Sequence, residues 1–326
     1  MLKKYLMIFL LILTLVLTGC SGSVPVSFQD NRANSNFNFS ISLSGDADTA
    51  ESFAADLAVA DGNIENAAMT ADVSNAAAIG LFDVGNAGTL YAKNIFSKVY
   101  PASLTKVMTA LVALKYSTPD KVLTASSNVY INEAGAQLCG ISEGDTMTLD
   151  QALHIMLINS ANDAAVMVAE GVGGTVENFM SMMNEEARTI GATNTNFINS
   201  NGLSDENHYT TLYDMYLIFN AAIQYSEFNE IINMPEYSTV YHSASGAEKS
   251  VTVSTTNLFL KGGANAPSGV TVIGGKTGTT NAAGHCLVLL SRNTGGNPYI
   301  SIVMKAYDQQ ILYNTMTSLL EAIPQG

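Results

Sequence analysis

The stretch PASLTKVMTA, residues 101–110, sets a serine and a lysine three positions apart at the start of an apolar segment. Pro101 suits the first turn of a helix, and residues three apart on a helix face the same way, so Ser103 and Lys106 should lie together. A neighbouring base can activate a serine hydroxyl, and lysine serves once burial or a second cation lowers its pKa. The pattern alone also fits a helix-capping serine followed by a surface lysine.

A second motif, Ser160-Ala161-Asn162, follows between two apolar segments. Ser-x-Asn is a weak signal, because it also occurs at residues 126–128 and 291–293, where turn chemistry explains it. A short loop at residues 160–162 would aim both side chains into a cleft. Ser160 could then pass a proton from the lysine to a leaving amine, and Asn162 could bind a substrate amide and hold the lysine.

The third motif is Lys276-Thr277-Gly278, which occurs once and follows two glycines on a β-forming stretch. Glycines in a strand allow a substrate backbone to approach closely. Lys276 is a point charge for a substrate carboxylate, and Thr277 and Thr279 offer hydroxyl groups to it. The backbone N–H groups of Ser103 and Thr279 are candidate oxyanion donors. A plain edge strand with a solvated lysine is the alternative, but three motifs in this order predict one active site.

Sequence periodicity predicts an α+β fold, an antiparallel sheet flanked by helices with a helical insertion. Turn residues 85–88 join the first two strands as a hairpin. Thr148 and Gln151 form a capping box ahead of an amphipathic helix. The expected strands are residues 76–84, 89–93, 270–273, 286–291 and 299–307. The expected helices begin at Pro101, Leu149 and Asn162 and cover residues 176–190 and 311–323.

The first 20 residues have the pattern of a secretory signal: two lysines, an apolar run over residues 5–17, and small residues before Cys20. The apolar run is too short to span a bilayer comfortably. Leu-Thr-Gly-Cys resembles the lipobox of bacterial lipoproteins, which predicts acylation of Cys20; an ordinary signal peptide is the alternative. Residues 21–71, rich in Ser, Asn, Asp, Ala and Gly, are expected to be a flexible tether, and residues 72–326 the folded domain.

Composition narrows the functional classes further. At 326 residues and 47% hydrophobic content the chain can bury a core, and its net charge of −14 argues against nucleic-acid binding. A protein with this negative net charge is not attracted to an anionic lipid surface, so attachment to a membrane would depend on the acyl chain on Cys20. Cys139 and Cys286 could pair in an oxidising compartment, but we expect two free buried thiols. The four scattered histidines imply no metal, and no organic cofactor is expected.

Over residues 75–322 the sequence resembles the D-alanyl-D-alanine carboxypeptidases, the low-molecular-weight penicillin-binding proteins. Beyond the three motifs, the resemblance includes Asn159–Ala165, Asn196-Phe197, Gly202-Leu203 and Ala283–Val288. It implies a β-lactamase/transpeptidase-like fold and a peptidoglycan stem peptide ending in D-Ala-D-Ala as substrate. It also implies that Ser103 is acylated, that D-alanine leaves and water releases the shortened peptide, and that β-lactams acylate the same serine. The enzyme is then expected on the extracytoplasmic face of a bacterial membrane.

Other functions remain open on sequence grounds. Thr279-Thr280-Asn281 is more like the transpeptidases, and residues 199–202 lack the proline frequent in that loop. A class A β-lactamase would require an acidic deacylation base, and the corresponding stretch, residues 193–199, has no acid. The alternative outside enzymes is a lipoprotein that only binds cell-wall peptides, but neither the nucleophile nor the base is altered.

Overall fold

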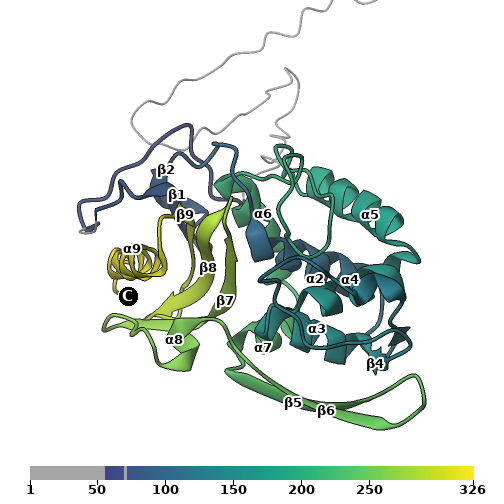
Figure 1. Cartoon of the computed structure of the whole chain (residues 1–326). Coiled ribbons are helices and arrows are strands. Elements are labelled where there is room, and N and C mark those ends of the chain that lie inside the picture. Colours follow the sequence, from purple (N-terminus) through teal and green to yellow (C-terminus); the bar gives the residue numbers. More distant parts are fainter. Residues whose placement is uncertain (1–55, 70–71) are drawn as a thin grey trace, which may run out of the picture. The chain divides into compact units, whose positions relative to one another are not determined.

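The core of the protein is a five-stranded antiparallel sheet in the order β2-β1-β9-β8-β7. The structure, a computed structural model, describes residues 56–69 and 72–326. Strands from both ends of the domain meet in this sheet, because β9 pairs with β1 on one side and with β8 on the other (Figure 1). The strands are β1 (Ala76–Asp83), β2 (Gly88–Lys93), β7 (Val270–Thr280), β8 (Gly284–Asn293) and β9 (Pro298–Ala306).

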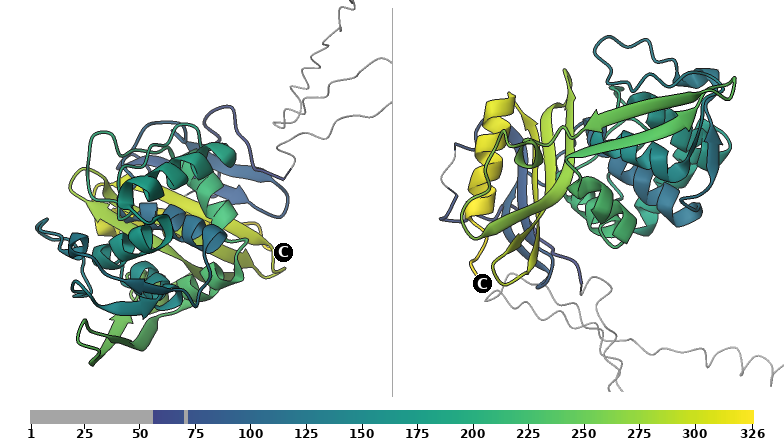
Figure 2. Two further views of the ribbon diagram at one scale, coloured as in Figure 1. Left: turned by 90° about the vertical axis from the view of Figure 1, so that its right-hand side faces the viewer. Right: turned by 90° about the horizontal axis from the view of Figure 1, so that it is seen from below.

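Helices cover both faces of this sheet, as Figure 2 shows. Alternate residues of β8 and β9 therefore belong to two different hydrophobic clusters. Leu287, Leu289 and Val303 pack with the C-terminal helix α9 (Gln309–Glu321), whereas Val288 and Ile302 face the other helices. Because both faces are buried, these strands read as continuous apolar runs rather than as an alternating pattern.

Apart from the short α8 (Leu258–Lys261), which contacts Tyr313 of α9, the remaining helices form a helical part beside β7 (Figure 1). A second antiparallel sheet, in the order β3-β4-β5-β6, borders it. The elements are α2 (Thr105–Tyr116), α3 (Leu149–Ile158), α4 (Asn162–Gly173), α5 (Val176–Thr189), α6 (Leu212–Ala222), α7 (Ser226–Asn233), α8 (Leu258–Lys261), β3 (Val122–Thr124), β4 (Thr146–Thr148), β5 (Glu236–His242), β6 (Glu248–Ser254) and the 3₁₀ turns η1 (Ala102–Leu104) and η2 (Ser127–Val129).

The predicted α+β arrangement, with its helical insertion, is confirmed. The capping box at the start of α3 is present in both directions, with the Thr148 side chain and the Gln151 side chain each bonding the other's backbone. Both cysteines are free; Cys286 is buried as expected, whereas Cys139 is only partly buried. Sequence periodicity did not reveal α6, α7 or the hairpin β5–β6.

Residues 56–69 pack against the main sheet, although the sequence suggested a tether that continued to residue 71. Ile64 and Ala92 form an antiparallel bridge with hydrogen bonds of 2.8 and 2.9 Å. The buried Ala58 donates its backbone N–H to the Tyr216 hydroxyl at 2.9 Å. The segment is held by these hydrogen bonds and by apolar side chains, because Ala58 belongs to the core and Leu57 and Ile64 pack against it. The compact unit therefore begins at Asp56.

The predicted signal sequence of residues 1–20, its Cys20 and the tether up to residue 55 lie outside the described residues. Among the helices that the structure describes, none combines the length and the apolar character needed to cross a bilayer.

Candidate active site

Ser103 and Lys106 lie together, as their spacing predicts. Ser103 sits in the 3₁₀ turn η1, which leads directly into α2, where Lys106 occupies the first turn. Lys106 Nζ donates a hydrogen bond to Ser103 Oγ at 2.9 Å. Once the amine is unprotonated, the same contact lets Nζ accept the hydroxyl proton, which is the step that activates a serine nucleophile.

The Lys106 ammonium is buried among oxygen acceptors. Its side chain is 0% exposed, and Nζ also donates to Asn162 Oδ1 at 2.7 Å and to the Asn201 carbonyl at 2.6 Å. Burial holds the pKa of Lys106 well below its usual range; the nearby Lys276 cation lowers it further, and Asp163 opposes them. A lysine in this environment is unprotonated over a far wider pH range than a surface lysine, as a general base requires.

The second lysine of the site, Lys276, is buried on β7. It is 1% exposed, and its Nζ donates to the Thr277 carbonyl at 2.9 Å. Burial lowers its pKa to about 7. Because the pKa of Lys106 is lowered as well, loss of the proton from one lysine leaves the other with a neutral neighbour. The site can therefore hold a neutral base and a cation at the same time.

Ser160 lies in the short connection between α3 and α4, as predicted. It has a positive φ of 65°, which is costly for a residue with a side chain and is found where the surroundings enforce it. The next two residues start α4, with Ala161 as its N-cap and Asn162 as its first helical residue. This backbone presents Ser160 to the cavity described below, while Asn162 reaches Lys106.

Three backbone segments meet closely around Ser103. A Cβ atom on Gly202 would lie 1.9 Å from the Ala102 carbonyl oxygen, and one on Gly278 would lie 3.0 Å from the Ser103 nitrogen. A side chain at Gly202 is excluded, and one at Gly278 would force its neighbours to shift. These close approaches bring β7 and the loop that contains Asn201 against η1, so that the motifs, far apart in sequence, form one site.

A cavity of about 610 Å³ opens beside Ser103. Its volume lies within the range of about 300–1,000 Å³ that ligand pockets usually have. Six of the eight predicted catalytic and substrate-binding residues line it: Ser103, Ser160, Asn162, Thr277, Gly278 and Thr279. The other two, Lys106 and Lys276, are buried next to this wall. The predicted lipidation site, Cys20, is not among the described residues.

Sequence reasoning missed several parts of the site. Asn201 accepts the Lys106 hydrogen bond through its backbone carbonyl, and a backbone group cannot be recognised from the residue type. Thr256 bonds the Thr277 hydroxyl from outside any motif, and residues 133–137 line the cavity from a loop without a chemical signature. Within the described residues, no group of three or more His, Cys, Asp or Glu is arranged to hold a metal ion.

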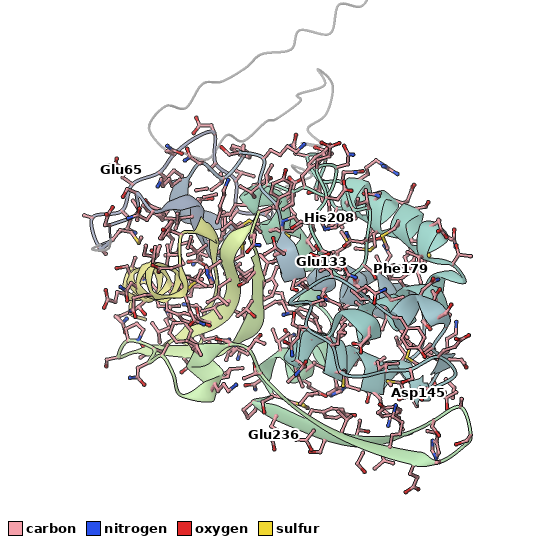
Figure 3. All side chains as sticks on the ribbon, viewed as in Figure 1. Glu65, Glu133, Asp145, Phe179, His208 and Glu236 are labelled. Carbon is pink, nitrogen blue, oxygen red and sulfur yellow. The ribbon has the colours of Figure 1, made fainter. Side chains whose placement is uncertain are left out.

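His208, labelled in Figure 3, contacts Thr105 in the segment that carries Ser103. It is 1% exposed, its Nδ1 accepts the Ile198 N–H at 3.2 Å, and its Nε2 lies 2.8 Å from Thr105 Oγ1. Since Nδ1 accepts, the ring proton is on Nε2 and is donated to Thr105. Burial lowers the pKa of His208 to about 4, so the ring stays neutral near pH 7.

Comparison with known proteins agrees with this geometry. The family model described as D-alanyl-D-alanine carboxypeptidase, peptidase S11, matches residues 64–308. The carboxypeptidase DacF of Bacillus subtilis is 30% identical over 236 residues, which are 71% of this chain and 58% of DacF. DacC of Escherichia coli is 30% identical over 249 residues, 74% of this chain and 59% of DacC. The chain thus spans less than two thirds of the length of these curated relatives.

Solved structures show the same fold. The crystal structure of the Streptomyces K15 DD-transpeptidase superposes with a TM-score of 0.71 at 26% sequence identity, covering 78% of this chain and 98% of that one. The predicted family resemblance is confirmed. Because the family match spans most of the chain and includes all three motifs, this protein belongs to the peptidase S11 family of D-alanyl-D-alanine carboxypeptidases.

Proposed function

We propose that this protein is a serine D-Ala-D-Ala carboxypeptidase that removes the terminal D-alanine from peptidoglycan stem peptides. One observation carries the proposal: a fully buried Lys106 Nζ lies 2.9 Å from Ser103 Oγ, with a second buried lysine nearby. A structural serine and lysine would gain nothing from this arrangement, because burying two ammonium groups costs stability. In a serine acyltransferase it provides the base and the electrophilic pocket.

Acylation of Ser103 follows from the contacts around it. Lys106 takes the hydroxyl proton, and Ser103 Oγ attacks the carbonyl carbon of the penultimate D-alanine. Ser160, which lines the same cavity, relays the proton to the departing D-alanine nitrogen. Asn162 fixes the Lys106 amine through its 2.7 Å hydrogen bond. A water molecule then attacks the ester and releases the shortened peptide.

The β7 edge would bind the substrate's C-terminal carboxylate. Lys276 supplies the positive charge, Thr277 and Thr279 supply hydroxyl groups, and Gly278 allows the peptide to lie close to the strand. The backbone N–H groups of Ser103 and Thr279 are proposed to stabilise the oxyanion. β-Lactams would enter the same cavity and acylate Ser103 in place of the peptide.

The same proposal includes a location. The pattern over residues 1–20 supports export and acylation of Cys20, which would hold the enzyme on the extracytoplasmic face of a bacterial membrane. In a bacterial host, Cys20→Ala should move the protein from the membrane fraction to the soluble fraction. Membrane retention of Cys20→Ala would contradict a lipid anchor.

The experiment that tests the activity is D-alanine release from a diacyl-tripeptide ending in D-Ala-D-Ala, followed for the wild type and for Ser103→Ala. We expect D-alanine release by the wild type and none by Ser103→Ala. Release that persists in Ser103→Ala, or wild-type protein that neither cleaves the peptide nor reacts with penicillin, would overturn it. The latter outcome would favour a module that binds cell-wall peptides without catalysis.

A DD-transpeptidase is the second candidate, favoured by the structural likeness to the Streptomyces K15 enzyme. The two activities differ only in what attacks the acyl-enzyme, an amine or water. Adding an amine acceptor such as glycylglycine to the same assay separates them, because a transpeptidase forms the amide product at the expense of the hydrolysed one. Rapid penicillin turnover without peptide cleavage would instead indicate a β-lactamase.

A further inference from the structure

One charged residue stands out on the wall of the cavity. Of the described residues that line it, Glu133 alone carries a formal charge at pH 7, when histidine is counted as neutral. Lys106 and Lys276 are buried beside the cavity and do not line it. The cavity therefore has a buried cation on the β7 side and one carboxylate on its wall.

The Glu133 carboxylate is available for a ligand. The described residues provide it with no hydrogen bond and no ion pair, whereas Glu170 and the buried Glu186, elsewhere in the protein, bond to side chains. Glu133 is labelled in Figure 3, where it lies toward the region between β7 and the helical part. An unpaired carboxylate beside a nucleophile is a recognition group without an internal partner.

The loop that carries Glu133 is fixed to the catalytic motif. The Ala136 N–H donates to the Glu133 carbonyl at 3.1 Å, which closes a turn. The Gln137 carbonyl accepts the Asn162 N–H at 2.8 Å, and the Gln137 side-chain amide donates to Asn159 Oδ1 at 2.8 Å. Glu133 is therefore four residues from a direct contact with the second motif.

A second anchor follows on the other side of the loop. Asp163, 1% exposed, accepts the backbone N–H groups of residues 139–141 at 2.9–3.1 Å. Such a carboxylate with several backbone donors holds its loop firmly. The wall that carries Glu133 is thus positioned by α4, the helix whose first residue holds Lys106. Pre-positioning of this kind lowers the cost of binding a charged group.

We propose that Glu133 binds a free ammonium group in the acyl part of the substrate, on the residue that precedes D-Ala-D-Ala. This inference rests on the proposed function, which puts the substrate carboxylate on the Lys276 side of the cavity. The acyl chain then occupies the rest of the cavity, where Glu133 is the one charged residue of the described lining. The enzyme would prefer peptides whose third residue from the C-terminus has an unmodified amino side chain.

The test compares two peptides that differ only in that charge: Nα-acetyl-Lys-D-Ala-D-Ala, with a free ε-amine, and its Nα,Nε-diacetyl form. For the wild type, kcat/KM should be roughly two- to fivefold higher for the free amine, the size of effect expected of a partly exposed ion pair. The ratio should fall to about one in Glu133→Gln and below one in Glu133→Lys. It should also shrink as salt rises from about 0.05 to 0.5 M.

Glu143→Gln is the matched control, since Glu143 is an exposed acid of the same connection that does not line the cavity. This variant should keep the wild-type ratio. A wild-type ratio of one or less, or an unchanged ratio in Glu133→Gln, would overturn the inference while the proposed function stands. If the wild type releases D-alanine from neither peptide, the proposed function fails, and this inference fails with it.

Discussion

Asn162 Oδ1 and Lys106 Nζ lie 2.7 Å apart, and both residues are buried, with 4% and 0% exposure. The contact joins the second motif of the sequence to the first. Lys106 has three oxygen partners, and Asn162 is the one that belongs to a different motif. The asparagine therefore fixes the direction of the amine toward Ser103.

Replacing this asparagine should slow acylation. Asn162→Ala removes one of the three hydrogen bonds that hold the Lys106 amine. Because a small misplacement of a catalytic group costs up to about 10²-fold in rate, we expect kcat/KM to fall by roughly 10–100-fold. Asn128→Ala is the matched control, because Asn128 belongs to another Ser-x-Asn sequence and bonds Glu170 outside the cavity. Stopped-flow measurement of penicillin acylation would check both. An undiminished rate in Asn162→Ala would contradict the role of this contact.

The two lysines should give a bell-shaped pH profile. Activity rises with pH as Lys106, whose pKa is lowered by burial and by Lys276, loses its proton and becomes a base. It falls again as Lys276, with a pKa of about 7 in the free enzyme, loses the charge that attracts the substrate carboxylate. Lys276→Arg keeps that charge, because guanidinium stays protonated. The alkaline limb of kcat/KM should therefore move to higher pH in Lys276→Arg, and a limb that stays in place would assign it to another group.

The buried charge of Lys276 should also lower the stability of the folded protein. The Lys276 side chain is 1% exposed, and taking a single charged group out of water costs roughly several kcal/mol of stability. Lys276→Met should therefore raise the free energy of unfolding near pH 6, where Lys276 is charged, while peptide cleavage is strongly reduced. Urea denaturation checks the first effect and D-alanine release the second. A destabilised Lys276→Met protein would mean that the ammonium group is needed for the fold.

His208 predicts a loss of stability in mild acid. Its pKa is about 4 in the folded protein, lowered from 6.5, so between these pH values the unfolded chain binds a proton that the folded chain does not. The stability contributed by the neutral ring is complete above pH 6.5 and is lost as pH falls toward 4. The loss amounts to about 3 kcal/mol. In His208→Gln, the unfolding free energy should depend less on pH over this window; an unchanged slope would exclude His208 as its source.

That the candidate site residues lie together was largely predictable, because they belong to short motifs with fixed spacing. Ser103 and Lys106 are three residues apart, so their contact follows from helix geometry alone. The Thr148–Gln151 capping box likewise marked the start of α3. Helix geometry cannot predict a contact between Ser103 and Lys276, which lie more than 170 positions apart. The prediction that the three motifs form one site therefore rested on their order in the sequence.

Other elements could not be predicted for physical reasons. Helix α6 is buried on nearly all sides, so its sequence lacks the one-sided apolar period of a surface helix. The segment that carries Ile64 mixes apolar residues with Asp, Asn, Glu and Gly without a regular period, and it is ordered by a two-residue bridge to β2 and by long-range packing on the core. The carbonyl of Asn201 reaches Lys106 only because Gly202 lets its loop approach Ala102.

The identity of the acylated residue tests directly whether Ser103 is the nucleophile. The protein is incubated with benzylpenicillin, quenched with acid, digested, and mapped by mass spectrometry. We expect one adduct with the mass of the intact penicillin, on Ser103 within residues 101–110, and no adduct in Ser103→Ala. An adduct on any other residue, or labelling that survives in Ser103→Ala, would contradict the assignment of Ser103 as the nucleophile.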